Sequence, residues 1–152
     1  MISREEEAVR AFESGYNCCQ SVFATYADLF GMDKQTALKL SSPMGAGVGR
    51  MREVCGAVSA MSLLAGLKYG NTDPTNQEAK TYIYEIVQEM SNRFKQDMDS
   101  VVCRELLKDV ETTAGVAPQE RSKAYYDARP CSRIVALASK IVEETLLIDD
   151  YM

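Results

Sequence analysis

Five cysteines are the residues with the clearest chemical potential in this chain of 152 residues, which contains no histidine. Without histidine, the usual catalytic pairs of serine or cysteine with an imidazole cannot form, and no imidazole can bind a metal. A cysteine thiolate is both a nucleophile toward disulfides and a ligand for soft metals. The cysteines are therefore candidates for redox chemistry or metal binding; the alternative is that they are small buried hydrophobic residues.

The predicted helix boundaries place most of the cysteines in first turns. Unpaired N–H groups give a helix N-terminus about half a positive charge, which stabilises a thiolate and lowers its pKa. Nearby arginines act in the same direction. Four cysteines are expected in first turns, and the fifth in the first or second turn of its helix: Cys18, Cys19, Cys103 and Cys131, and then Cys55.

The spacing of the cysteines excludes several common motifs. No two of them are separated by two residues, so a thioredoxin-type motif, a zinc ribbon and the usual ferredoxin ligand run are all absent. Cys18 and Cys19 are adjacent and point about 100° apart on a helix, so only one of them can readily face a common site. A shared site must therefore be assembled from separate helices.

A glycine-rich stretch precedes Cys55 and is the second candidate for binding chemistry. Glycines let backbone N–H groups gather around an anion or a thiolate at a helix start. The stretch lacks the strand and the spacing of a dinucleotide fingerprint, and a flexible connection between helices is the alternative interpretation. Its candidate cofactor-binding residues are Gly45, Gly47, Gly49 and Arg50.

Hydrophobic residues repeat every three or four positions along most of the chain, which predicts helices separated by short turns. No sustained alternation and no hairpin dipeptide such as Asn-Gly indicates a strand. The chain also has no linker and no repeat. We therefore expect one all-α domain over residues 1–152, a helical bundle of about five to seven helices.

Capping residues and turns set the expected helix starts. A helix is predicted over residues 50–69, and the longest helix is predicted to start at Asp73 and Pro74 and to run through Phe94. Its length and apolar stripe suit the spine of the bundle. The predicted side-chain caps of other helices are Ser3 with Glu6, Asn17 with Gln20, Asp33, and Ser100.

Composition excludes several classes of protein. The net charge of −5, from 17 basic and 22 acidic residues, argues against a nucleic-acid partner. No apolar run reaches the roughly 20 residues of a membrane helix, and the first ten residues lack the apolar core of a secretion signal. These features predict a cytoplasmic protein without a membrane partner. Its methionines and tyrosines could serve a homo-oligomer surface or the core.

The segments around four cysteines resemble, in order, the motifs of the C_GCAxxG_C_C family, described as redox-active proteins. The first segment is Gly15–Gln20, and the second, Glu53–Ala60, follows the glycine-rich stretch; Cys103 and Cys131 begin the last two. The resemblance spans about residues 8–142. It implies that Cys18 is the first family cysteine and that Cys19 is an additional cysteine outside the family motif. Glycine is usual in the family at the position of Ala60, which implies slightly looser packing near the second cysteine.

The thiols and this resemblance together predict a thiol-based redox protein, with the character of an enzyme left open. One cysteine would attack a disulfide, a peroxide or another electrophile, and a second would resolve the product. The partner would be a redox protein or a small electrophilic substrate. One alternative is that four thiolates hold an iron–sulfur cluster or zinc; another is a non-catalytic helical interaction domain. The candidate catalytic residues are Cys18, Cys55, Cys103 and Cys131.

Among these cysteines, Cys18 is expected to react first because its helix has the clearest cap, Asn17. Cys55 is its expected partner, and Cys103 and Cys131 form an expected second pair. Cys19 is expected to serve in packing.

Overall fold

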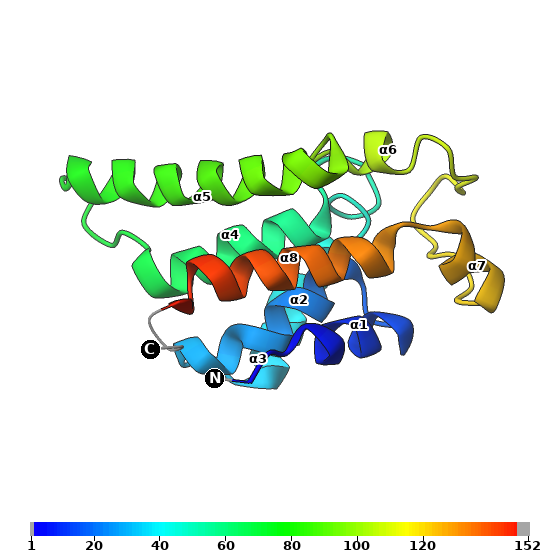
Figure 1. The fold of residues 1–152 in the computed structure, drawn as a ribbon, viewed down its shortest axis with the longest axis horizontal. Coiled ribbons are helices and arrows are strands. Elements are labelled where there is room, and N and C mark those ends of the chain that lie inside the picture. Colours follow the sequence, from blue (N-terminus) through cyan, green and yellow to red (C-terminus); the bar gives the residue numbers. More distant parts are fainter. Residues whose placement is uncertain (1, 149–152) are drawn as a thin grey trace.

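Helices make up the regular structure of the computed structural model, which describes residues 2–148 (Figure 1). Within these residues the β contacts are limited to one isolated bridge, between Val54 and Val102. The helices are α1 (Glu5–Glu13), α2 (Cys18–Tyr26), α3 (Lys34–Ser41), α4 (Gly56–Tyr69), α5 (Gln77–Met98), α6 (Cys103–Leu106), α7 (Lys123–Ala128) and α8 (Cys131–Thr145), with 3₁₀ turns η1 (Ala27–Phe30) and η2 (Ser42–Met44). The all-α prediction is confirmed, and the six helices other than the short α6 and α7 fall within the predicted number.

Two predicted caps are confirmed at the starts of α2 and α3. Asn17 and Gln20 form a reciprocal capping box: Asn17 Oδ1 accepts the Gln20 N–H at 2.9 Å, and Gln20 Oε1 accepts the Asn17 N–H at 3.1 Å. The Asp33 carboxylate accepts the Thr36 N–H at 3.0 Å. The capping box fixes Cys18 as the first residue of α2.

Four other predicted helix starts are wrong. α5 begins at Gln77 instead of at Asp73 and Pro74, because the Asn76 side chain caps it by accepting the Ala79 N–H at 3.0 Å. α1 begins after Arg4, and the Ser3 hydroxyl accepts the N–H of Glu5 at 3.3 Å, not that of Glu6, while it donates to Glu143 of α8. α6 begins after Val102, whose N–H is accepted by the Ser100 hydroxyl at 2.9 Å. α4 begins at Gly56, six residues later than expected, because the chain before it follows a left-handed path.

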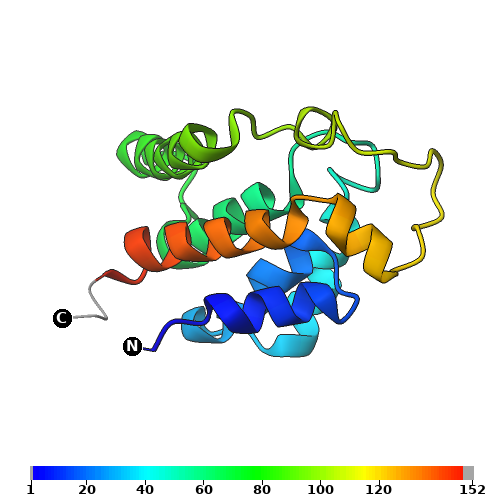
Figure 2. The ribbon, with the colours of Figure 1, turned by 45° about the vertical axis from the view of Figure 1, so that its right-hand side comes forward.

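The helices pack around α2, α4 and α8, with α1 and α3 on one side and α5 on the other (Figures 1 and 2). α5 is not the spine that its length suggested: it lies at the edge of the bundle against α4 and α8, and only Met90 and Phe94 among its residues are buried. Tyr82, from the predicted apolar stripe, is 47% exposed. No helix within residues 2–148 combines the length and the apolar character needed to cross a bilayer.

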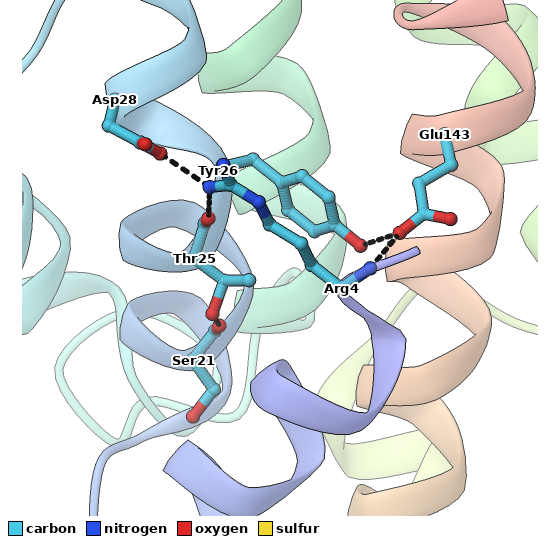
Figure 3. A network of polar contacts seen from close by, with 6 residues as sticks. All are labelled: Arg4, Ser21, Thr25, Tyr26, Asp28 and Glu143. Atoms are coloured by element: carbon cyan, nitrogen blue, oxygen red, sulfur yellow. Dashed lines mark hydrogen bonds and ion pairs between the residues drawn. The ribbon is translucent and has the colours of Figure 1, made fainter. Parts of the chain in front are cut away.

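A buried polar network joins the start of the chain to α2 and α8 (Figure 3). The completely buried Tyr26 hydroxyl donates to the Glu143 carboxylate, which also accepts the Arg4 N–H at 2.8 Å. The Arg4 guanidinium donates to the Thr25 carbonyl at 2.9 Å and pairs with Asp28 at 2.7 Å. These contacts hold together the helices whose first residues carry two of the cysteines.

Replacing Tyr26 with phenylalanine is expected to destabilise the fold by about 1–3 kcal/mol, because a buried carboxylate loses a donor. Urea unfolding of Tyr26→Phe against the wild-type protein measures this loss. Tyr84→Phe is the matched control, since Tyr84 is 66% exposed and should change the free energy of unfolding little. Equal midpoints for the two variants would contradict the importance of the network.

Candidate functional site

Four of the cysteines lie at helix starts. The predicted first-turn positions of Cys18, Cys103 and Cys131 are confirmed, whereas Cys55 precedes its helix instead of lying within it. Cys18, Cys103 and Cys131 are the first residues of α2, α6 and α8, and Cys55 is the N-cap of α4. Cys19, the second residue of α2, is completely buried in the hydrophobic core. Each of the first four therefore lies beside the unpaired N–H groups of a different helix.

These four cysteines, here called the cysteine cluster, interact with one another across the interior. Cys18 and Cys131 interact most strongly with each other, since their mutual interaction is the first cause of the pKa shift of each, and Cys18 also interacts electrostatically with Cys55 and Cys103. Cys55 in turn interacts with Cys103 and Cys131. All four side chains are free thiols in the structure. Within residues 2–148, no group of three cysteine or acidic side chains is arranged to hold a metal ion.

A short antiparallel bridge ties the segment of Cys55 to the segment of Cys103. The Cys55 N–H donates to the Val101 carbonyl at 2.8 Å, and the Cys103 N–H donates to the Glu53 carbonyl at 2.6 Å. Sequence reasoning missed this bridge because one bridged pair is too short to show alternation. The sequence feature that could have indicated the bridge is the valine directly before each cysteine, Val54 and Val102, because valine favours extended backbone.

The residues before the bridge form a left-handed segment, defined as Ala46–Arg50. All five have positive φ angles, 53°, 72°, 64°, 55° and 62° in order. A left-handed conformation costs roughly 1–2 kcal/mol for each non-glycine residue, and it is rarest for a β-branched residue such as Val48. Backbone bonds offset this cost, among them the Gly49 N–H to the Pro43 carbonyl at 2.7 Å and the Glu53 N–H to the Gly47 carbonyl at 2.9 Å.

The glycine-rich residues predicted to bind a cofactor have two different surroundings. Gly45, Gly49 and Arg50 line a cavity beside the cysteine cluster. Gly47 instead packs against the cluster, where a Cβ atom on Gly47 would lie 2.7 Å from the Cys103 Cβ. The stretch therefore brings backbone close to a thiol, as the glycines suggested, although it is not continuous with α4.

The cavity has a volume of about 480 Å³. Three thiols of the cluster line it, those of Cys18, Cys103 and Cys131, while Cys55 does not. Four arginines also line it: Arg50, Arg52, Arg121 and Arg129. Three of these arginines, Arg50, Arg52 and Arg129, lie close to cysteines in the sequence, which made them candidates. Arg121 was missed because it reaches the cavity from the loop before α7.

Arg129 is the buried cation of the site. It is 8% exposed, its guanidinium stacks 4.2 Å from the centre of the Tyr125 ring, and it donates to Gln119 and hydrogen-bonds to the Cys131 sulfur. No carboxylate of the described chain forms an ion pair with it. A buried cation requires a nearby anion. The Cys131 thiolate is in position to supply that negative charge.

The pKa of Cys131 is lowered from 9.0 to about 7, first by the hydrogen bond from Cys18 and then by Arg129 and Arg121, which together outweigh burial. The pKa of Cys18 is raised well above 9.0 by the same hydrogen bond and by burial. The pair therefore loses its first proton much more readily than its second. These directions differ from the order expected if Cys18 reacts first, because the neighbouring thiol and burial outweigh the N-terminus of α2 in setting the pKa of Cys18.

The remaining thiols favour the protonated form. Burial raises the pKa of Cys55 to about 12, although the N–H groups of Ala57 and Val58 oppose the change. Burial also raises the pKa of Cys19 to about 12. The pKa of Cys103 is raised by burial, against a hydrogen bond from Arg52. Cys131 thus stands out among the five cysteines as the thiol most readily ionised.

One protein family, described as "Putative redox-active protein (C_GCAxxG_C_C)", matches residues 16–145 of the chain. No curated protein and no solved structure gives a significant match. The matched residues begin just before the capping residue of α2 and end with the last residue of α8. They contain the whole cysteine cluster and the left-handed segment.

Proposed function

The chain belongs to this redox-active family, and we propose from that membership and from the cysteine cluster that it is a thiol-dependent oxidoreductase. Cys131 is the nucleophile and Cys18 is the second redox thiol. The position of these two interacting thiols together on the wall of a cavity that contains arginines carries the proposal. The pairing differs from the sequence expectation, which joined Cys18 to Cys55.

The proposed reaction is a two-step thiol–disulfide exchange. The Cys131 thiolate attacks one sulfur of a substrate disulfide, forms a mixed disulfide and releases the other half of the substrate as a thiolate. Cys18 then loses its proton to solvent, and its sulfur attacks the Cys131 sulfur. This second step forms a Cys18–Cys131 disulfide and releases the remaining half of the substrate as a thiolate, so two electrons pass from the protein to the substrate.

The other residues of the site support these steps. Arg129 and Arg121 stabilise the Cys131 thiolate before the attack. Cys55 and Cys103 have raised pKa values and stay protonated while Cys131 reacts. A dithiol reductant, either a protein or a small molecule, returns Cys18 and Cys131 to thiols. We place the activity in the cytoplasm, where such reductants keep free cysteines reduced.

Limited oxidation of the reduced protein by a small disulfide is expected to yield a disulfide between Cys18 and Cys131. Peptide mass spectrometry of the unreduced digest identifies the bond. Cys19→Ala is the matched control, because Cys19 neighbours Cys18 in the chain but is buried in the core, and this variant should form the same disulfide.

Two results would overturn the proposal. One is a stable disulfide that joins Cys18 to Cys55, with Cys131 left free. The other is anaerobically purified protein that contains iron or zinc in a fixed ratio and has its four cluster thiols blocked to alkylation, which would favour the metal-binding alternative.

A further inference from the structure

The charge of the cavity is opposite to the charge of the chain. The chain has a net charge of −5, yet four arginines line the cavity and no aspartate or glutamate does so. The arginines come from separate segments: two from the residues before the β-bridge and two from the residues around α7. The fold therefore gathers positive charge at the thiol that is most readily ionised.

Neutral groups hold these arginines in place. The Arg50 guanidinium donates to the Gly115 carbonyl at 2.6 Å and to the Thr113 hydroxyl at 2.9 Å. The Arg121 guanidinium donates to the carbonyls of Phe12 at 3.1 Å and Tyr16 at 3.2 Å. Carbonyls and hydroxyls fix a guanidinium without neutralising its charge.

Ion pairs do not neutralise the charge of the cavity arginines either. The ion pairs of the described chain use other cations, and none includes a cavity arginine. The Cys131 thiolate supplies one negative charge against four positive charges. The cavity therefore keeps an excess of positive charge even when its nucleophile is ionised.

We infer that the cavity selects small disulfides that carry negatively charged groups such as carboxylates. This inference rests on the proposed function and names its substrate class. Guanidinium groups bind carboxylates through paired, charge-assisted hydrogen bonds. A volume of about 480 Å³ is in the range of small-molecule sites. The same charges stabilise the anionic thiolate that leaves when Cys131 attacks.

The test compares three small disulfides of different charge: dithiodipropionate, which is dianionic, hydroxyethyl disulfide, which is neutral, and cystamine, which is dicationic. Single-turnover rates of Cys18–Cys131 disulfide formation are measured for each compound. Each rate is divided by the rate of the same compound with a simple free thiol, which removes differences in intrinsic reactivity. The dianionic compound is expected to react about tenfold or more faster than the neutral one, and cystamine more slowly than either.

Salt and charge variants test the cause of this order. Raising the ionic strength from about 0.01 M to about 1 M shortens the screening length from about 30 Å to about 3 Å and should shrink the differences. Arg50→Gln should lower the preference for the dianionic compound severalfold, and Arg50→Lys should retain most of it. Arg93→Gln is the matched control, because half-buried Arg93 lies on α5 and pairs with Glu89 away from the cavity.

The outcomes separate the inference from the proposed function. Equal corrected rates for the three compounds, or a preference for cystamine, would overturn charge selection while the thiol exchange stands. Failure of all three compounds to produce the Cys18–Cys131 disulfide would overturn the proposed function and the inference with it.

Discussion

Cys131→Ser should remove the thiol that alkylates fastest at neutral pH and should abolish oxidation of Cys18 by small disulfides. With a pKa of about 7 instead of 9.0, the Cys131 thiol is about half ionised at pH 7 rather than about one part in a hundred. Nucleophilicity falls with pKa, so about a fivefold to tenfold rate advantage over an ordinary thiol remains. Time-resolved iodoacetamide labelling with peptide mass spectrometry measures it at each cysteine.

The dependence of this labelling on pH shows which groups lower the pKa of Cys131. The groups around Cys131 are Arg129, Arg121 and Tyr125 beside the cavity and the other three cluster thiols. Arg129→Gln removes a cation that favours the thiolate, so the labelling midpoint of Cys131 should move to higher pH. Arg133→Gln is the control, because Arg133 is as near in sequence but is exposed and outside the cavity. Equal midpoints in both variants would show that the pKa of Cys131 does not depend on Arg129.

Gly47→Ala should strongly destabilise the protein near the site. A Cβ on Gly47 would lie 2.6 Å from the Glu53 backbone nitrogen and 2.7 Å from the Cys103 Cβ, too close for either to remain in place. Gly49→Ala is the matched control: its φ of 55° is also left-handed, but the nearest atom to its new Cβ is 4.0 Å away. Both variants carry the left-handed cost of about 1–2 kcal/mol, and Gly47→Ala should lose about 1–3 kcal/mol more from crowding.

Urea unfolding of the two glycine variants measures this difference. The variant at Gly47 should also change the labelling of Cys103, because its methyl group displaces the backbone that fixes that thiol. If both variants unfold at the same denaturant concentration, Gly47 does not pack against Cys103 as the structure shows.

Features set by neighbouring residues were predictable from the sequence. The start of α2 depends on Asn17 and Gln20, three residues apart, and both of their hydrogen bonds are present. The first-turn position of Cys131 follows in the same way from the proline before it. Local caps and turns act over a few residues, which is the range that a pattern in the sequence can report.

Features set by distant contacts were not predictable. Four non-glycine residues take positive φ angles around the left-handed segment, Ala46, Val48, Arg50 and Arg52, against their own preference. The same limit applies to the choice of the reactive thiol. Helix position alone favours Cys18, but the order of pKa values depends first on the interaction between Cys18 and Cys131 and then on Arg129 and Arg121, and these contacts exist only in the folded chain.

Cys18 and Cys131 are separated by about 110 residues, since one begins the second helix and the other begins the last. A covalent bond between them would restrict most of the unfolded chain, and the chain-entropy model gives about 4–5 kcal/mol of stabilisation for a ring of that size. Folding and disulfide formation are linked in one thermodynamic cycle, so folding in turn favours the Cys18–Cys131 disulfide by the same free energy. For a two-electron couple this lowers the reduction potential by about 100 mV relative to the unfolded chain. If the proposed disulfide forms, the topology itself therefore makes the folded, reduced protein a stronger electron donor than the unfolded chain.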